Sequence, residues 1–226
     1  MIRIVVADDH RLIRDGLCAL IRSEPDMDVV GEAADGRELV AIVAKKRPDV
    51  VLMDVAMPQL NGVEATRQIV ELGSPARIIA VSMHNNRQVV QGILDAGAVG
   101  YILKDSAFDE LAQAVRIVHE GRNYLSPAIA RHVDGPAGKS RKRKDGSPLT
   151  LREREVLQLV AEGNSTRLIA AQLHIGIKTV ETVETHRRQV MNKLKIFSVA
   201  ELTKYAVRNG MSSLDLQPSA APPLNQ

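Results

Sequence analysis

The sequence predicts an α/β domain with a doubly wound, five-stranded parallel sheet, followed by a small all-α domain of the helix-turn-helix type. Two observations carry this prediction. Over the first 120 residues, five short apolar runs alternate with amphipathic helical stretches, the pattern of an open parallel sheet with helices on both faces. After residue 147 the pattern changes to four consecutive helical segments, two of them joined by a short turn of helix-turn-helix length.

Five segments have the near-continuous apolar composition of strands that are buried on both faces. The predicted strands are Ile2–Ala7, Met27–Glu32, Val50–Asp54, Arg77–Ser82 and Val99–Leu103. In open sheets of this type, ligands bind outside the carboxyl ends of the strands. Residues at those ends are therefore candidates for a functional site.

Apolar residues at helical spacing predict a helix after each strand. They are Leu12, Ile13, Leu17, Leu20 and Ile21 in the first helix, Leu39, Ile42 and Val43 in the second, and the segments Glu64–Leu72, Gln88–Leu94 and Leu111–Val118 in the others. Ser106 and Asp109 predict a capping box at the start of the last helix. Cys18 is expected to be a packed thiol on the first helix.

The four helices of the second domain have recognisable start signals. The predicted N-caps are Thr150 (with Glu153 in a capping box), Ser165 and Ser198 (with Glu201). The third helix is the longest and is expected to end near Leu194. The turn at His174–Gly176, between the second and third helices, has helix-turn-helix spacing.

Composition places the boundaries between these parts. Residues 1–120 form the predicted α/β domain and residues 148–210 the helical domain. Residues 121–147 contain Gly135-Pro136-Ala137-Gly138 and five basic residues in 139–144, and are predicted to be a flexible basic linker. Residues 211–226 are predicted to be a disordered tail.

The net charge of +3 hides an asymmetry between the domains. Residues 1–138 carry 15 Lys/Arg against 19 Asp/Glu, whereas residues 139–210 carry 15 against 7. This distribution has two interpretations that charge alone does not separate: a polyanionic partner for the second half, or a basic surface that is simply solvated. No apolar run approaches the roughly 18 residues that span a bilayer, so no membrane partner is expected. The single cysteine excludes an internal disulfide, which fits a cytoplasmic location.

Five polar residues lie at the ends of the predicted strands. Asp8 and Asp9 follow the first strand, Asp54 ends the third, Ser82 ends the fourth and Lys104 follows the fifth. Because the carboxyl ends of parallel strands share one edge of the sheet, these side chains are expected to meet there. Three carboxylates together require a neutralising cation, and oxygen ligands favour Mg²⁺. A lysine and a hydroxyl beside a carboxylate are the groups that phosphoryl transfer to that carboxylate requires.

These residues, together with the segment Asp54–Gly62 and with Tyr101-Ile102-Leu103-Lys104, resemble the receiver domains of two-component response regulators, whose fold is flavodoxin-like. The resemblance covers about residues 1–120. It implies that Asp54 is the phosphoacceptor and that a sensor histidine kinase is the donor.

The resemblance also implies a role for each of the other residues at this edge. Mg²⁺ would be held by Asp8, Asp9, Asp54 and the backbone carbonyl of Ala56. Lys104 would bind the phosphoryl group, Ser82 would turn towards it, and Tyr101 would be the switch aromatic. In the loop after Asp54, Pro58 would fix the turn and Gly62 would allow an unusual backbone angle.

Residues 148–210 resemble the LuxR-type helix-turn-helix domain of the NarL/FixJ response regulators. The matching segments are Leu149–Gly163, Lys178-Thr179-Val180-Glu181, His186-Arg187-Arg188 and Met191–Leu194. The resemblance implies that the third helix enters the major groove of double-stranded DNA. The candidate DNA-binding residues are Lys178, Thr179, Val183, His186, Arg187, Arg188 and Lys193, and Lys195 also suits a phosphate contact.

The fourth predicted helix carries Val199, Leu202 and Ala206 in line. This stripe has two interpretations of equal weight. It is either the dimerisation surface for a second copy of the chain or ordinary packing within the domain.

One segment departs from the family pattern. Residues 179–184 contain Thr-Val-Glu twice, where the family has it once. Three extra residues add about 4.5 Å of rise and about 300° of rotation to a helix. Either the first copy belongs to a longer turn before the helix, or the recognition surface is rotated. Gly176 in place of a capping Ser, and Leu168 in place of an acidic residue, are smaller departures.

The function that the sequence predicts is a transcriptional regulator that is phosphorylated on Asp54, forms a homodimer on phosphorylation and then binds DNA. It is not expected to be an enzyme beyond its own phosphoryl transfer and dephosphorylation. The alternative is a phosphorelay or phosphate-sink protein whose DNA binding is impaired by the duplicated Thr-Val-Glu. A metal-dependent phosphotransferase acting on small molecules would require a substrate pocket that the loops do not indicate.

Overall fold

A computed structural model describes residues 1–133, 148–173 and 179–212 of the 226-residue chain. Contacts divide the chain into two compact units, Met1–Gly146 and Ser147–Gln226. The turn at His174–Gly176, Lys178, most of the predicted linker and most of the predicted tail lie outside the described residues. Each unit is described by itself.

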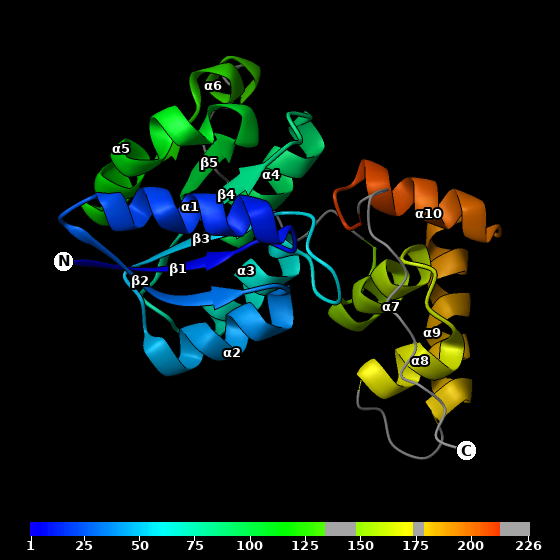
Figure 1. The fold of residues 1–226 in the computed structure, drawn as a ribbon. Coiled ribbons are helices and arrows are strands. Elements are labelled where there is room, and N and C mark those ends of the chain that lie inside the picture. Colours follow the sequence, from blue (N-terminus) through cyan, green and yellow to red (C-terminus); the bar gives the residue numbers. More distant parts are fainter. Residues whose placement is uncertain (134–147, 174–178, 213–226) are drawn as a thin grey trace. The chain divides into compact units, whose positions relative to one another are not determined.

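The first unit alternates strands and helices along the chain, as predicted (Figure 1). Its elements are β1 (Ile2–Ala7), α1 (Arg11–Ser23), β2 (Met27–Ala33), α2 (Gly36–Lys46), β3 (Val50–Asp54), α3 (Gly62–Glu71), β4 (Arg77–Ser82), α4 (Arg87–Ala96), β5 (Gly100–Leu103), the 3₁₀ turn η1 (Lys104–Ser106), α5 (Ala107–His119), β6 (Tyr124–Leu125) and α6 (Pro127–Val133).

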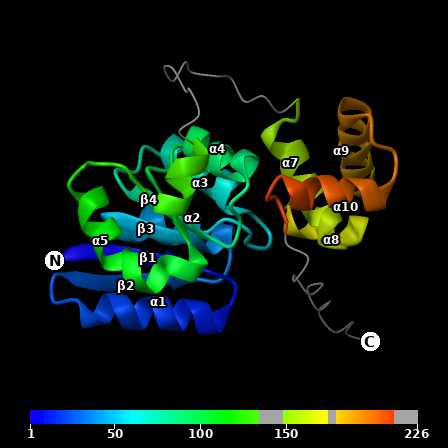
Figure 2. The same ribbon diagram turned by 90° about the horizontal axis from the view of Figure 1, so that it is seen from above.

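The strands form one open parallel sheet in the order β2-β1-β3-β4-β5-β6, which confirms the predicted fold class with one strand more than expected. Figure 2 shows β1, β3 and β4 side by side in the middle of the unit. The register places Val5 opposite Val51, Val51 opposite Ile78 and Ala80 opposite Tyr101.

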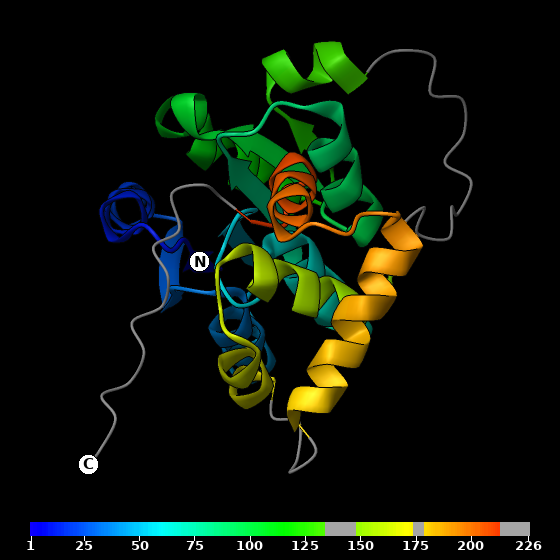
Figure 3. The same cartoon turned by 90° about the vertical axis from the view of Figure 1, so that its right-hand side faces the viewer.

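Side chains alternate between the two faces of the sheet and build two cores. Val5, Val51 and Ile78 belong to a cluster with apolar residues of α2, α3 and α4. Val6, Leu52 and Ile79 belong to a second cluster with α1 and α5, in which Cys18 is fully buried. Figure 3 shows the helices in these two layers around the sheet. Both faces of the strands are covered, which explains their near-continuous apolar composition.

The predicted linker is wrong over its first part, because residues 124–133 form β6 and α6 on the first unit. β6 pairs with β5, with Tyr101 opposite Leu125. The hydroxyls of Tyr124 and Ser126 donate to the Glu110 carboxylate at 2.9 and 2.6 Å. Ile129 is fully buried in the same cluster as Tyr101. The α/β fold therefore continues beyond residue 120.

The second unit consists of helices among the residues that the structure describes. They are α7 (Leu151–Ala161), α8 (Thr166–Gln172), α9 (Thr179–Leu194) and α10 (Val199–Arg208). Two small clusters form its core, one around Val156, Leu159 and Val183, the other around Leu157, Val190 and Leu202. These buried positions place α7 and α9 in both clusters.

The predicted helix starts hold in part. The capping box of Thr150 and Glu153 is present, and Ser165 accepts a hydrogen bond from the Leu168 N–H, both as predicted. Ser106 and Ser198 do stand before α5 and α10, but neither side chain caps its helix. The Ser106 hydroxyl instead donates to the Leu103 carbonyl at 3.3 Å. A 3₁₀ turn precedes α5, and it turns this serine towards the end of β5.

Within the described residues, no helix combines the length and the apolar composition that crossing a membrane demands.

Candidate functional site

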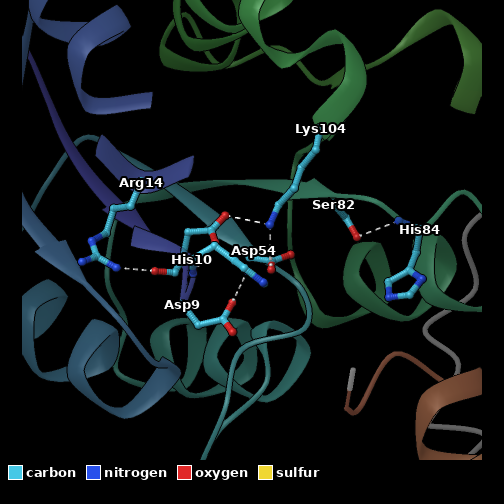
Figure 4. Close-up of polar contacts among 8 residues, drawn as sticks. Asp9, His10, Arg14, Asp54, Ser82, His84 and Lys104 are labelled. Carbon is cyan, nitrogen blue, oxygen red and sulfur yellow. Dashed lines mark hydrogen bonds and ion pairs between the residues drawn. The ribbon is translucent and has the colours of Figure 1, made fainter. Parts of the chain in front are cut away.

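The strand order brings the five predicted polar residues to one edge of the sheet. β1, β3, β4 and β5 are consecutive neighbours, so their carboxyl ends lie side by side. Asp54 ends β3 and Ser82 ends β4, and Lys104 follows β5 directly. Figure 4 shows Lys104 reaching Asp54 beside Asp9 and His10, while the Ser82 hydroxyl at the same edge points towards His84. The juxtaposition that the sequence predicts is confirmed.

Lys104 bridges two carboxylates at the centre of this edge. Its Nζ lies 2.8 Å from Asp8 Oδ2 and 2.9 Å from Asp54 Oδ2. The exposed fractions of the three side chains are only 9% for Lys104, 1% for Asp8 and 6% for Asp54. Burial by itself lowers the pKa of Lys104, but the two carboxylates outweigh it and hold that pKa above its ordinary value. The lysine is therefore a fixed positive charge beside Asp54.

The ligand atoms of Asp8, Asp9, His10 and Asp54 all lie within 4.8 Å of one another. Burial raises the pKa of Asp9, and the charges of Asp54 and Asp8 raise it further, against the opposing effect of His10. Crowded carboxylates of this kind gain stability from a cation. The acidic cluster is compatible with a divalent metal site, and its carboxylate oxygens are the donors that hard divalent cations take.

His10 belongs to this cluster although the sequence reasoning did not select it. Its Nδ1 lies 3.1 Å from Asp9 Oδ1, and its backbone N–H donates to Asp8 Oδ1 at 2.9 Å. Arg14 donates to the Asp8 carbonyl at 2.6 Å and so fixes the loop after β1. In the sequence, only the position of His10 next to Asp9 hints that it belongs to this cluster. Neighbouring residues can point in different directions, so the sequence alone does not show that the His10 side chain faces the carboxylates.

The loop between β3 and α3 presents Asp54 through close backbone contacts. A Cβ atom on Gly62 would lie 2.5 Å from the Asp54 carbonyl oxygen and 2.9 Å from the Val55 Cα, so only glycine fits. The expectation of an unusual backbone angle at Gly62 is wrong; the left-handed residue of this loop is Gln59, with φ of 63°. Gln59 is held there by a hydrogen bond from its amide to Asp35 at 3.2 Å.

Ser82 and Tyr101 meet at the backbone of a third residue, His84. The His84 N–H donates to Ser82 Oγ at 3.1 Å, and the Tyr101 hydroxyl donates to the His84 carbonyl at 2.6 Å. Tyr101 is fully buried, and this burial raises its pKa to about 12. The ring is therefore packed inside the unit, and the segment between β4 and α4 connects it to the acidic edge.

In the second unit, α9 carries most of the predicted DNA-binding residues. Arg188 is exposed, and His186 and Arg187 are half-buried. Lys178 lies outside the described residues, and of Thr179 only the backbone is described, as the first residue of α9. Lys195, in the left-handed region with φ of 58°, is exposed just after the helix.

The prediction that Val183 binds DNA is wrong. Its side chain is 1% exposed and belongs to the core cluster with Val156 and Ile169. A buried side chain cannot contact a base, so Val183 is a core residue and not a DNA contact. The sequence placed it on the wrong face because the tandem Thr-Val-Glu left the register of the helix open.

Lys193 is engaged inside the domain. Its Nζ donates to the Glu153 carboxylate at 2.7 Å, and Glu153 is the buried acidic member of the α7 capping box. Burial alone raises the pKa of Glu153, but the bond from Lys193 and those from Thr150 bring it below its ordinary value. A phosphate contact by Lys193 would have to compete with this pair.

The proposed dimerisation stripe on α10 is wrong in two of its three residues. Leu202 is 1% exposed and Ala206 is fully buried, and both pack against Leu157 and Val190 in the core of the domain. Only Val199, 41% exposed, is accessible. Of the two interpretations of this stripe, packing within the domain therefore holds for Leu202 and Ala206.

Comparison with known proteins gives two family matches. Residues 4–116 match the response regulator receiver domain, and residues 147–206 match the bacterial regulatory proteins of the luxR family. The chain is 37% identical over 215 residues to the transcriptional regulatory protein LiaR of Bacillus subtilis (strain 168), covering 92% of this chain and 98% of LiaR.

Solved structures agree with both matches. The signal receiver domain of the response regulator NarL from Mycobacterium tuberculosis is 35% identical with a TM-score of 0.52, and the match covers 54% of this chain and 98% of that one. The response regulator RcsB in its complex with DNA is 25% identical with a TM-score of 0.56, covering 92% of this chain and 98% of that one.

The parallel sheet with its acidic edge, followed by the helical unit, defines a receiver domain joined to a DNA-binding domain. The chain belongs to the two-component response regulators that carry a LuxR-type DNA-binding domain, and it is a transcriptional regulator.

Proposed function

We propose that a sensor histidine kinase phosphorylates Asp54 and that this modification switches on binding to double-stranded DNA. The observation that carries the proposal is the position of Lys104, whose ammonium group lies within 3 Å of both Asp8 and Asp54 at the carboxyl edge of the sheet. A positive charge held beside one buried carboxylate is suited to a group that arrives with negative charge on its oxygens.

In the transfer, one oxygen of the Asp54 carboxylate forms a bond to phosphorus while the bond from phosphorus to the kinase histidine nitrogen breaks. The electrons of the broken bond stay on the kinase histidine nitrogen, and the ring leaves as neutral imidazole with one proton, which the other ring nitrogen already carries or water supplies. The second product is an acyl phosphate on Asp54. Lys104 Nζ and the Ser82 hydroxyl donate hydrogen bonds to the phosphoryl oxygens.

The cation proposed for this site is Mg²⁺. Asp8, Asp9 and Asp54, with the backbone carbonyl of Ala56, would hold it, and when bound it would neutralise the charge that gathers on the phosphoryl oxygens. The fit rests on three carboxylates with ligand atoms within 4.8 Å of one another.

The signal leaves the site through His84. If Ser82 turns to the phosphoryl group, its hydrogen bond with the His84 N–H changes, and the same residue's carbonyl accepts the hydroxyl of Tyr101. A shift at Ser82 would thereby reach the buried ring of Tyr101, which belongs to the same core cluster as Ile129 of α6. This is a two-state element of the kind that a modification biases.

The DNA partner is proposed from the relatives and from the charge of the second half. RcsB, which is similar over 92% of this chain, forms a complex with DNA. Arg187, Arg188 and Lys195 are the described basic residues that best suit phosphate contacts, and Lys178 joins them by its place in the sequence. Formation of a homodimer on phosphorylation stays a prediction. Beyond its own phosphoryl transfer and dephosphorylation, no catalysis is proposed.

The test is capture of DNA fragments from the source genome by the full-length protein, with and without beryllofluoride and Mg²⁺ as a mimic of phospho-Asp54. Discrete fragments enriched only in the activated sample are expected. The Asp54→Asn variant is the control and should enrich none in either condition. If the protein binds beryllofluoride but enriches no fragment, the proposal that phosphorylation switches on DNA binding would be overturned. A role as a phosphate sink would then be favoured.

A further inference from the structure

The duplicated Thr-Val-Glu lies entirely within one helix. α9 begins at Thr179 and continues to Leu194, so both copies are helical, and Figure 3 shows this helix, coloured yellow to orange, without a break. The first copy is therefore not part of a longer turn. It supplies the first turn of the helix.

The second copy fixes the register of α9 on the domain. Val183 is buried in the core, and Glu184 accepts a hydrogen bond from the Thr166 hydroxyl at 2.8 Å. Arg187 also lies 3.7 Å from the Glu184 carboxylate. The valine and the glutamate of the second copy, Val183 and Glu184, therefore both make contacts within the domain.

In the first copy the corresponding valine and glutamate are exposed to solvent. Val180 is 45% exposed although it is apolar, and Glu181 is exposed. Among the residues that the structure describes, the Glu181 carboxylate has no hydrogen-bond or ion-pair partner. The duplication has therefore placed a valine and a carboxylate, both unused by the fold, on a turn about 4.5 Å beyond the anchored copy.

Helical periodicity sets the face on which this carboxylate lies. Glu181, Thr185 and Arg188 follow one another at intervals of four and three residues, and all three are exposed. The Thr185 hydroxyl donates to the Glu181 carbonyl at 2.8 Å, which ties the added turn to the rest of this face. Glu181 thus extends the same exposed stripe that carries Arg188, the most accessible arginine of the helix.

We propose that the added turn reads DNA bases, with Glu181 accepting a hydrogen bond from a cytosine amino group and Val180 contacting a thymine methyl group in the major groove. The inference rests on the proposed DNA-binding function and concerns the copy of Thr-Val-Glu whose valine is not buried in the core of the domain. A carboxylate beside phosphates lowers affinity for every sequence, so its contribution to recognition is selectivity among bases.

The experiment is selection from a random double-stranded DNA library by the full-length protein, activated with beryllofluoride and Mg²⁺. It compares the wild-type chain with Glu181→Gln, which keeps the shape of the side chain and removes its charge. Glu201→Gln is the matched control, because Glu201 is an exposed glutamate of α10 in the same domain. A third variant lacks residues 179–181, and its helical content is checked by circular dichroism.

The wild-type protein is expected to prefer cytosine at one position of each half-site by about fivefold or more. Glu181→Gln should change this preference to adenine, the base that glutamine pairs with, and should bind all sequences somewhat more tightly. Glu201→Gln should keep the cytosine preference. The variant that lacks residues 179–181 should lose the cytosine preference, while its base preferences at the other positions of the DNA site should be unchanged.

Identical base preferences for the wild type and Glu181→Gln, with a uniform rise in affinity, would overturn the inference and leave Glu181 as a solvated charge. Failure of the activated wild-type protein to select any sequence is a different result. It would overturn the proposed DNA-binding function, and the inference with it.

Discussion

In the absence of a metal cation, Lys104 supplies the positive charge that stabilises the carboxylates of Asp8 and Asp54. It is the cationic group within 3 Å of both Asp8 and Asp54, and all three side chains are nearly inaccessible. Buried charges are tolerated only when they are paired, so the removal of one partner costs more than the pair contributes.

Lys104→Met is expected to destabilise the first unit by about 3 kcal/mol in the presence of a chelator, because two buried carboxylates lose their counter-charge. Millimolar Mg²⁺ should recover much of this loss, since the cation replaces the missing charge. Urea denaturation followed by circular dichroism, with and without Mg²⁺, measures both effects. Lys45→Met, at an exposed position of α2, is the control and should change stability by less than about 0.5 kcal/mol. A stability deficit in Lys104→Met that Mg²⁺ leaves unchanged would contradict the prediction.

Tyr101 predicts a dependence of stability on alkaline pH. Burial raises its pKa to about 12, above the value of about 10 for an unfolded chain. The stabilisation that the neutral hydroxyl provides is complete below pH 10 and is lost as the pH rises towards 12, because the unfolded chain ionises first. Tyr101→Phe lacks this contribution.

At pH 8, Tyr101→Phe should be less stable than the wild type by about 1 kcal/mol, since the hydrogen bond to His84 is lost and its carbonyl is left without that donor. Between pH 10 and pH 12 this difference should shrink. Thermal unfolding of both proteins across that range measures it. Parallel pH curves would show that Tyr101 ionises as freely in the fold as in the unfolded chain.

Whether a residue of the site could be predicted from the sequence depends on whether it acts through its side chain or through its backbone. Asp54, Ser82 and Lys104 could be predicted because strand ends in a parallel sheet are forced together. The role of His84 could not, because it acts through its backbone N–H and carbonyl, which every residue possesses. Val183 was misassigned because two identical copies of Thr-Val-Glu give the same local pattern, and only packing decides which valine is buried.

Among the elements, the loop between β3 and α3 shows how a single glycine positions Asp54, the proposed phosphoacceptor. The atoms that a Gly62 Cβ would meet belong to the backbone of Asp54 and Val55, so they cannot rotate away. The N–H of Gly62 also donates to the Val55 carbonyl at 2.8 Å. The first turn of α3 is therefore in direct contact with the end of β3.

Gly62→Ala is expected to lower stability by about 1–3 kcal/mol, because the added methyl group forces the backbone at Asp54 to shift. Phosphorylation by a small-molecule phosphodonor should slow as well. Gly92→Ala is a matched control, since a Cβ at Gly92 meets nothing within 4 Å and the position is inside α4. That variant should gain up to about 1 kcal/mol from improved helix propensity. Equal effects of the two substitutions on thermal stability would refute the argument from close contact.

Elements were predicted well where a long pattern specified them and poorly where they were short. β1, β3 and β4 have the predicted bounds because continuous apolar runs admit few alternatives. β6 has two residues and α6 has seven, too few for a period to be recognised. Both form because the rest of the sheet offers them β5 and a buried site for Ile129.

For the whole molecule, the separation of charge between the two halves decides how affinity depends on salt. Residues 139–210 carry the excess of basic residues, so the release of counterions from DNA is assigned to the second half. Each phosphate contact contributes about 0.9 to the slope of log K against log salt.

Arg188→Ala should weaken DNA binding evenly across sequences and reduce that slope by about 1. Arg11→Ala removes another exposed arginine, from α1 of the acidic half, and should leave the slope unchanged. Binding isotherms of the activated full-length protein at several salt concentrations provide the comparison. A slope that responds to Arg11 as strongly as to Arg188 would place the DNA contacts outside the second half.

The position of the duplicated turn bears on how recognition by this chain can evolve. The described core residues of α9, Val183 and Val190, both lie C-terminal to the first copy of Thr-Val-Glu, so the added turn leaves these two packing positions in place. Under the proposed DNA-binding function, the added turn therefore changes the surface that α9 offers to DNA, while the buried positions Val183 and Val190 stay the same. Target preference and stability can then be inherited as separate traits, and a regulator can acquire new promoters while its fold stays as it was.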